Sequence, residues 1–100
     1  MAFEAMFQPI QIGKLTIRNR VLSTAHAEVY ATDGGMTTDR YVKYYEEKAK
    51  GGIGLAICGG SSSVAIDSPQ GWWKSVNLAT DKIIPHFQNL ADAMHKHGAK

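Results

Sequence analysis

The sequence predicts an α/β fold in which parallel strands alternate with helices. Two short apolar runs, residues 20–25 and 53–58, are typical of strands that are covered on both faces. Two longer segments, residues 39–50 and 81–97, carry apolar side chains at helical spacing. Each run precedes one of these segments, which is the order of a β–α–β–α arrangement. Residues 9–19 come before them and predict a hairpin.

The hairpin is indicated by alternating apolar and polar side chains. Ile10 and Ile12 are expected to share one face, and Leu15 and Ile17 another. Gly13-Lys14 separates the two strands. Glycine at the first central position of a two-residue turn is typical of type II′.

The first helix is predicted over residues 39–50. Either Thr37 or Thr38 serves as its N-cap, and Gly51-Gly52 ends it by supplying a residue in the left-handed region. One stripe of residues spaced four apart is expected to face the core, namely Tyr41, Tyr45 and Ala49.

The second helix is predicted to begin with Thr80 or Asp81 as its N-cap and to stop at Gly98. Pro85 falls in its first turn, where the missing N–H costs little. Ala99-Lys100 is expected to lead out of the helix. The predicted apolar face comprises Ile83, Phe87, Leu90 or Ala91, and Met94.

A chain of 100 residues forms at most one small domain. Two parallel strands cannot cover their own outer edges. We therefore expect these residues to be the opening portion of a larger barrel or sheet, either in a truncated chain or in an assembly that supplies the remainder.

Composition excludes several classes of protein. Apolar residues make up 44% and charged residues 20%, which is globular rather than disordered. A net charge of +2 is too small for an arm that binds nucleic acid or a membrane surface. The apolar runs are too short to span a bilayer, and no secretory signal opens the chain, so a cytoplasmic location is expected. The single cysteine excludes an internal disulfide.

The carboxyl ends of parallel strands are where α/β folds bind ligands. In this chain that rule selects residues 24–27 and 58–61. Small residues in both segments let a flat ligand approach the backbone, although the same residues could merely pack the barrel end. His26 is expected either to contact a ligand or to bond to a neighbouring loop. Glu28 either pairs with His26 or faces solvent, and solvent is the favoured alternative. Cys58 is interpreted as a packing residue rather than a nucleophile, because no cation is near it in sequence.

The other histidines do not predict a metal site. His86, His95 and His97 lack metal-ligand spacing and companion ligands, so no metal is expected. The long loop over residues 59–80 contains Trp72-Trp73, which either closes over a ligand or anchors the loop.

The stretch from Phe7 to Val21, FQPIQIGKLTIRNRV, resembles the opening of the Old Yellow Enzyme family of FMN-dependent oxidoreductases. The branch that is most similar holds the 2,4-dienoyl-CoA reductases and trimethylamine dehydrogenase. Ser23-Thr24-Ala25-His26 and Cys58-Gly59-Gly60 carry that likeness. Later pieces that fit the family in order are Tyr44-Tyr45-Glu46, Gly51-Gly52, Gly60 and residues 93–98.

The resemblance implies a (β/α)8 TIM barrel, with residues 1–100 as the N-terminal hairpin and two βα units of a single FMN-binding domain. It implies a homo-oligomeric enzyme that transfers hydride through non-covalent FMN. NAD(P)H or an amine would be the donor, and an unsaturated carbonyl or an electron-transfer partner the acceptor. The alternatives are an N-methyl amine or betaine-type demethylase and, in another class, a non-catalytic fragment that self-associates. The catalytic residues, the phosphate site and any iron–sulfur cluster would lie beyond Lys100.

The resemblance also implies which residues contact the flavin. In the family, the residues after the first barrel strand and the small residue that ends the second strand line the flavin ring. Trimethylamine dehydrogenase links its flavin through a cysteine at the position of Ala27, so a covalent link is not expected here. The same enzyme has a substrate-cage tyrosine at the position of Gly60, so trimethylamine is not the expected substrate. The implied cofactor contacts are Thr24, Ala25, His26, Ala27 and Gly60.

Overall fold

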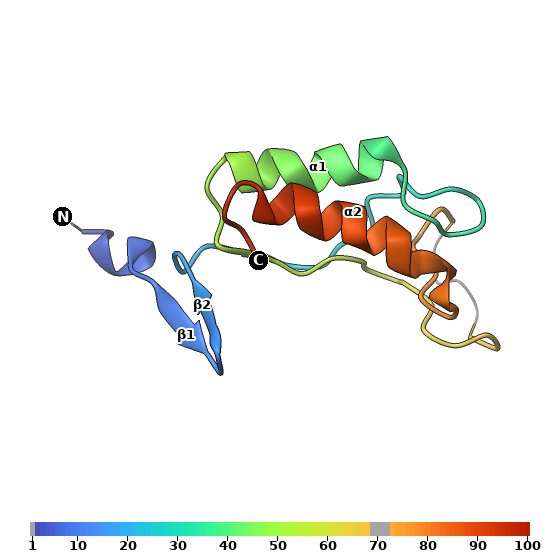
Figure 1. Cartoon of the computed structure of the whole chain (residues 1–100), viewed down its shortest axis with the longest axis horizontal. Coiled ribbons are helices and arrows are strands. Elements are labelled where there is room, and N and C mark those ends of the chain that lie inside the picture. Colours follow the sequence, from blue (N-terminus) through green and yellow to red (C-terminus); the bar gives the residue numbers. More distant parts are fainter. Residues whose placement is uncertain (1, 69–72) are drawn as a thin grey trace.

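The computed structural model describes residues 2–68 and 73–100. A hairpin is followed by a strand, a helix, a second strand and a second helix (Figure 1). Apart from two short 3-10 helices, this is the predicted order. The elements are η1 (Glu4–Phe7), β1 (Ile10–Ile12), β2 (Leu15–Ile17), β3 (Leu22–Ser23), α1 (Asp39–Lys50), β4 (Leu55–Ala56), η2 (Asp81–Ile83) and α2 (Ile84–His95).

The hairpin of β1 and β2 forms as predicted, but its side-chain faces differ from the prediction. Ile10 pairs with Ile17, and Ile12 pairs with Leu15. Residues directly opposite each other in an antiparallel pair project from the same face. The expectation of two separate faces is therefore wrong, because the two-residue turn brings all four apolar side chains to one face. Gly13 has a φ of +57°, as the first central position of a type II′ turn requires.

β3 and β4 are parallel, as predicted, but each strand is much shorter than its apolar run. Their register pairs Leu22 with Leu55. Backbone hydrogen bonds continue the pairing to Val21 at one end and to Ile57 at the other. Beyond these residues the chain leaves its neighbour and enters loops. Apolar composition alone does not extend a strand, because a strand also needs a partner for its backbone groups.

The last residue of the chain does more than lead out of α2. Lys100 donates its backbone N–H to the Gly54 carbonyl at 2.9 Å and accepts from the Ala56 N–H at 2.8 Å. The next N–H of β4, on Ile57, instead bonds to Ser23 of β3 at 2.9 Å. β4 therefore has a neighbour on each side at this point, and the expectation that its outer edge is wholly uncovered is wrong there.

α1 spans the predicted residues 39–50. The side chain of Thr38 caps it by accepting from the Tyr41 N–H at 3.1 Å. Gly52 follows the helix with a φ of +107°, which is the predicted left-handed stop. The predicted stripe is buried: Tyr41, Tyr45 and Ala49 are each no more than 1% exposed.

α2 begins later than predicted. Thr80 is the N-cap of one turn of 3-10 helix, η2, which begins at Asp81, and the α-helix starts at Ile84. Pro85 has no N–H to donate to the residue four places earlier, which explains why the preceding turn is not α-helical. Gly98 follows the helix with a φ of +83°, as predicted for the stop. Three members of the predicted apolar face are buried, namely Ile83, Leu90 and Met94.

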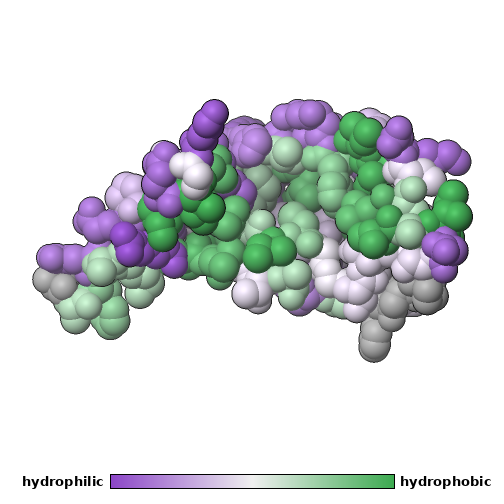
Figure 2. All heavy atoms as spheres, turned by 90° about the horizontal axis from the view of Figure 1, so that it is seen from below, coloured by the Kyte–Doolittle hydropathy of each residue, from purple (hydrophilic) through white to green (hydrophobic). Residues whose placement is uncertain are grey.

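The two helices lie together on one side of β3 and β4 (Figure 1). The core beneath them is built from the buried faces of α1 and α2 together with Ala31, Val76 and Ala99. No described helix covers the other side of the strands. Figure 2 views that side from below and shows hydrophobic atoms across its middle. Leu22 and Ile57 are each 47% exposed.

Arg18, just after β2, joins the hairpin region to both helices. Its guanidinium donates to the Ile53 carbonyl at 2.8 and 3.1 Å, to the Ala49 carbonyl at 2.8 Å, and to the His97 carbonyl. These carbonyls lie near the C-terminal ends of α1 and α2, where the helix dipole is negative. A cation there is attracted to the negative helix ends and adds hydrogen bonds to their carbonyls.

The long loop over residues 59–80 is tied to the body of the molecule. Ser63 forms a parallel bridge with Asn77, whose N–H donates to the Gly35 carbonyl at 2.9 Å. Trp72 lies outside the described residues. Trp73 is 67% exposed, so the structure gives it no anchoring role.

Candidate functional site

The ends of β3 and β4 lie side by side and bring together the five residues predicted as cofactor contacts. His26 and Ala27 follow β3, and the peptide that joins them lies against Gly60 after β4. His26 is partly exposed. The exposed members of the group are Thr24, Ala25 and Ala27. Small side chains at this edge leave the backbone accessible from outside.

Glycine is required at position 60 for two reasons, the backbone conformation and the lack of room for a Cβ atom. Its φ of +102° lies in the region that favours glycine. A Cβ at this position would lie 2.3 Å from the carbonyl carbon of His26, 2.5 Å from its oxygen and 2.8 Å from the nitrogen of Ala27. Any side chain would therefore meet the neighbouring strand end before it met a ligand. Gly60, which the family resemblance implies as a flavin contact, also allows the ends of β3 and β4 to lie against each other.

His26 is hydrogen-bonded at both ring nitrogens. Its Nδ1 lies 3.1 Å from the Thr24 carbonyl, and its Nε2 lies 2.6 Å from the Tyr44 hydroxyl. The side chain remains 40% exposed. The sequence anticipated a bond to a nearby loop residue but missed Tyr44, which lies on α1.

Glu28 points into the core, so the expectation that it faces solvent is wrong. Its side chain is only 5% exposed, and the Tyr45 hydroxyl donates to its Oε2 at 3.2 Å. Burial raises the pKa of Tyr45, and the negative charge of Glu28 raises it further. The pKa of Tyr41 is also raised, first by burial and then by the neighbouring Tyr45 and Glu28. The sequence carried a signal for this contact, because buried tyrosine hydroxyls need hydrogen-bond partners.

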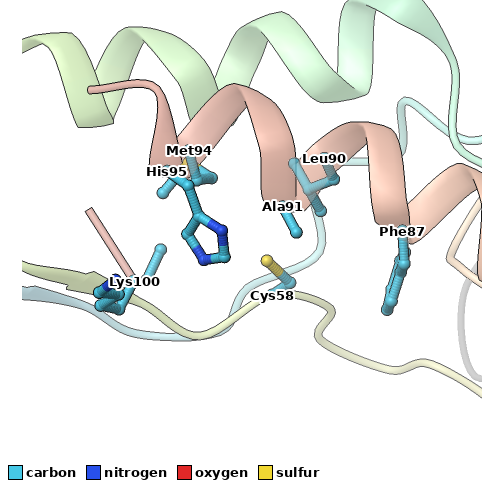
Figure 3. A pocket seen from close by; sticks show the side chains of 8 residues that line it. Cys58, Phe87, Leu90, Ala91, Met94, His95 and Lys100 are labelled. Carbon is cyan, nitrogen blue, oxygen red and sulfur yellow. The ribbon is translucent and has the colours of Figure 1, made fainter. Parts of the chain in front are cut away.

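Cys58 is turned toward the helices. Figure 3 shows its sulfur near side chains of α2, in a groove of about 190 Å³ that is lined mainly by residues of α2. Burial, and then the negative charge of Glu28, raises the pKa of the thiol to about 11, against the opposing effect of Lys48. Lys48, which is distant from Cys58 in sequence, is thus close enough in the fold to act on the thiol. Its charge does not lower the pKa of the thiol below the ordinary value, because burial and Glu28 outweigh it. This geometry agrees with a packing role.

Of the remaining histidines, His97 makes a contact that joins two elements of the fold. The Nε2 of His97 lies 3.0 Å from a carboxylate oxygen of Glu46, which links the end of α2 to α1 and lowers the pKa of Glu46. Among residues 2–68 and 73–100, no group of three or more histidine, cysteine or acidic side chains could hold a metal ion. In that same part of the chain, no helix is long and apolar enough to cross a membrane.

Curated relatives match almost the whole chain. An N,N-dimethylglycine/sarcosine dehydrogenase from Chromohalobacter salexigens is 81% identical over 100 residues, which are all of this chain and 14% of that protein. A multifunctional alkene reductase/demethylase from Caballeronia cordobensis is 41% identical over 96 residues, covering 96% of this chain and 14% of the relative. A probable N-methylproline demethylase from Rhizobium meliloti is 37% identical over 99 residues, covering 99% and 14%. The chain thus spans about 14% of the length of these relatives.

Solved structures give the same result for the fold. The old yellow enzyme from Trypanosoma cruzi superposes with a TM-score of 0.85 at 28% identity, covering 99% of this chain and 26% of that one. A 2-naphthoyl-CoA reductase complex superposes with a TM-score of 0.82 at 28% identity, covering 97% and 14%. The chain therefore has the fold of a segment of these TIM-barrel enzymes. The family model of the NADH:flavin oxidoreductase / NADH oxidase family matches residues 5–100. The chain belongs to this family, as its resemblance to Old Yellow Enzymes implied.

Proposed function

We propose that residues 1–100 form the opening segment of a single FMN-binding (β/α)8 barrel domain. The observation that carries the proposal is the meeting of the ends of β3 and β4 at Gly60, on a layer whose described α-helices both lie on one side. In such barrels the strand ends face the ligand, and the uncovered side of the strands faces the barrel interior. The proposed contacts with the flavin ring are Thr24, Ala25, His26, Ala27 and Gly60.

The residues present fit a non-covalent flavin. The exposed segment from Thr24 to Ala27 offers peptide groups and small side chains to a planar ring. Ala27 has no atom that could form a covalent link to a cofactor. Leu22 and Ile57, half-exposed on the same strands, supply apolar surface that excludes water. Bound FMN would supply hydride-accepting chemistry, while these residues hold and orient it.

We infer that the complete protein demethylates N-methylated amino acids such as N,N-dimethylglycine or sarcosine. The 81% identity to the Chromohalobacter salexigens dehydrogenase supports this substrate class. In this reaction an N-methyl C–H bond would break, and bound FMN would supply the acceptor for the hydride and its two electrons. Water then hydrolyses the resulting iminium ion to formaldehyde and the demethylated amine.

A second candidate is reduction of an activated alkene with NAD(P)H as the hydride donor. The relative from Caballeronia cordobensis, whose name joins alkene reductase and demethylase, favours keeping it. The two candidates share the flavin site and differ in what reduces the flavin, so one experiment separates them.

The test uses the full-length protein that carries this chain or, equally, the Chromohalobacter salexigens dehydrogenase with its matching segment replaced by this chain. Either is called the complete barrel protein below. We expect it to purify with FMN, and N,N-dimethylglycine to bleach the flavin absorbance anaerobically with release of one formaldehyde per flavin. Bleaching by NADPH alone, followed by reoxidation with an activated alkene, would support the second candidate. A protein that retains no FMN would overturn the proposal.

A further inference from the structure

The ring of His26 is fixed in one tautomer by its two partners. Its Nδ1 lies 3.1 Å from the backbone carbonyl of Thr24, and a carbonyl oxygen only accepts hydrogen bonds. The proton of a neutral imidazole must therefore sit on Nδ1. The Nε2 then has a lone pair, and the Tyr44 hydroxyl 2.6 Å away donates to it.

Tyr44 is itself held in place on α1. Its ring packs edge-on against Tyr30 and Tyr45, with centroid distances of 5.6 and 5.4 Å. The Lys48 ammonium lies 4.6 Å from the centre of the same ring. Three neighbours therefore fix the direction in which the Tyr44 hydroxyl points.

The other charged group beside His26 does not replace Tyr44. The nearer carboxylate oxygen of Glu28 lies 4.0 Å from the Nε2, which is beyond hydrogen-bond distance. That carboxylate already accepts from the Tyr45 hydroxyl. The bond from Tyr44 is thus the one direct bond to Nε2 among the described residues.

We propose that Tyr44 is a positioning residue that holds the neutral form of His26 as the Nδ1–H tautomer, with neither ring nitrogen free toward the cofactor surface. This inference rests on the proposed function, because it takes the 40% exposed side chain of His26 to lie beside the flavin. His26 then acts on the flavin through its shape and ring surface rather than by donating a hydrogen bond. The polar donors that remain for the flavin at this edge are backbone N–H groups and the Thr24 hydroxyl.

The first test needs no flavin. Diethyl pyrocarbonate acylates an imidazole nitrogen whose lone pair is free, and His26 is followed by mass spectrometry at pH 8 in the flavin-free complete barrel protein. We expect Tyr44→Phe to speed acylation of His26 by about fivefold, the equivalent of one neutral hydrogen bond. Acylation of the exposed His95 should not change. Tyr30→Phe, the same change on the adjoining ring, should leave His26 at the parent rate. Equal rates for His26 in Tyr44→Phe and the parent would overturn the proposal.

The second test uses the flavin as a reporter. Tyr44→Phe should make the midpoint potential of the flavin more positive, because a ring that is free to turn can donate to the electron-rich reduced flavin. In a His26→Gln background the same substitution should have no further effect, since Tyr44 acts through His26. An equal shift in both backgrounds, or no shift in a flavin-loaded protein, would contradict the proposal. If the parent protein holds no FMN, the proposed function fails, and acylation of His26 still decides the role of Tyr44.

Discussion

Replacement of Gly60 by alanine should weaken flavin binding by a calculable amount. The new Cβ would lie 2.3 Å from the carbonyl carbon of His26, where real Cβ atoms are not found, so the peptide between His26 and Ala27 must shift. Overpacking of this kind costs about 1–3 kcal/mol. The φ of +102° adds backbone strain of roughly 1–3 kcal/mol. The flavin-free variant relaxes by moving this peptide away from the new Cβ. The peptide belongs to the proposed flavin surface, so binding of FMN requires it to return against the Cβ, and the packing part of the cost then opposes binding.

Gly52 supplies a matched control. Its φ of +107° imposes similar strain, but a Cβ there would meet no atom within 4 Å. Gly52→Ala should therefore lower stability without changing the affinity for FMN. Gly60→Ala should raise the dissociation constant for FMN by roughly 5–150-fold, the equivalent of its packing cost.

Both variants are measured in the complete barrel protein by fluorescence titration of the flavin-free form, with circular dichroism to show that each one folds. Gly60→Val should have a larger effect in the same direction. If Gly60→Ala binds FMN as tightly as Gly52→Ala, the strand ends do not form the flavin surface and the reasoning is refuted.

Other predictions concern stability, reactivity and completeness. Arg18→Ala removes the hydrogen bonds to the carbonyls of Ala49, Ile53 and His97 and should destabilise the complete barrel protein by about 2–4 kcal/mol in denaturant unfolding; a loss below about 0.5 kcal/mol would count against a stabilising role for these bonds. Burial raises the pKa of Cys58 from 9.0 to about 11, so its alkylation by iodoacetamide at pH 8 should be about 100-fold slower than that of an unperturbed thiol, and a rate near the free value would contradict this. The pKa of Glu46 is lowered, first by its bond to His97, so its contribution to stability is present above the ordinary value of 4.5 and is lost as the pH falls through the folded value. The difference in melting temperature between parent and Glu46→Gln should accordingly shrink between pH 6 and pH 3, and a constant difference would exclude the link. The 100-residue chain alone should bind FMN weakly and self-associate, because the phosphate site of such barrels lies after later strands; sub-micromolar affinity in a clean monomer would refute this.

Local periodicity explains which parts of the fold were predictable from sequence. The buried stripe of Tyr41 and Tyr45 follows from helical spacing, and the stops at Gly52 and Gly98 follow from the freedom of glycine at positive φ. These features depend on residues within a few positions of one another. The order of strands and helices was predictable for the same reason.

Contacts between distant residues were not predictable from a single sequence. Tyr44 and His26 are 18 residues apart, and Arg18 reaches the carbonyl of His97 across 79 residues. Strand length depends on such pairing too, which is why β3 and β4 are shorter than their apolar runs. Residues 24–27 and 58–61 could be placed together in advance because parallel strands end at one edge, and the family resemblance then selected the five proposed contacts among them.

The placement of the flavin is the central claim, and a crystal structure of the complete barrel protein with FMN tests it most directly. The account predicts flavin ring atoms within about 4.5 Å of the backbone of residues 24–27 and of Gly60, with the Tyr44 hydroxyl still bonded to Nε2 of His26. A flavin ring seated elsewhere in the barrel, with these strand ends in contact only with protein, would contradict it.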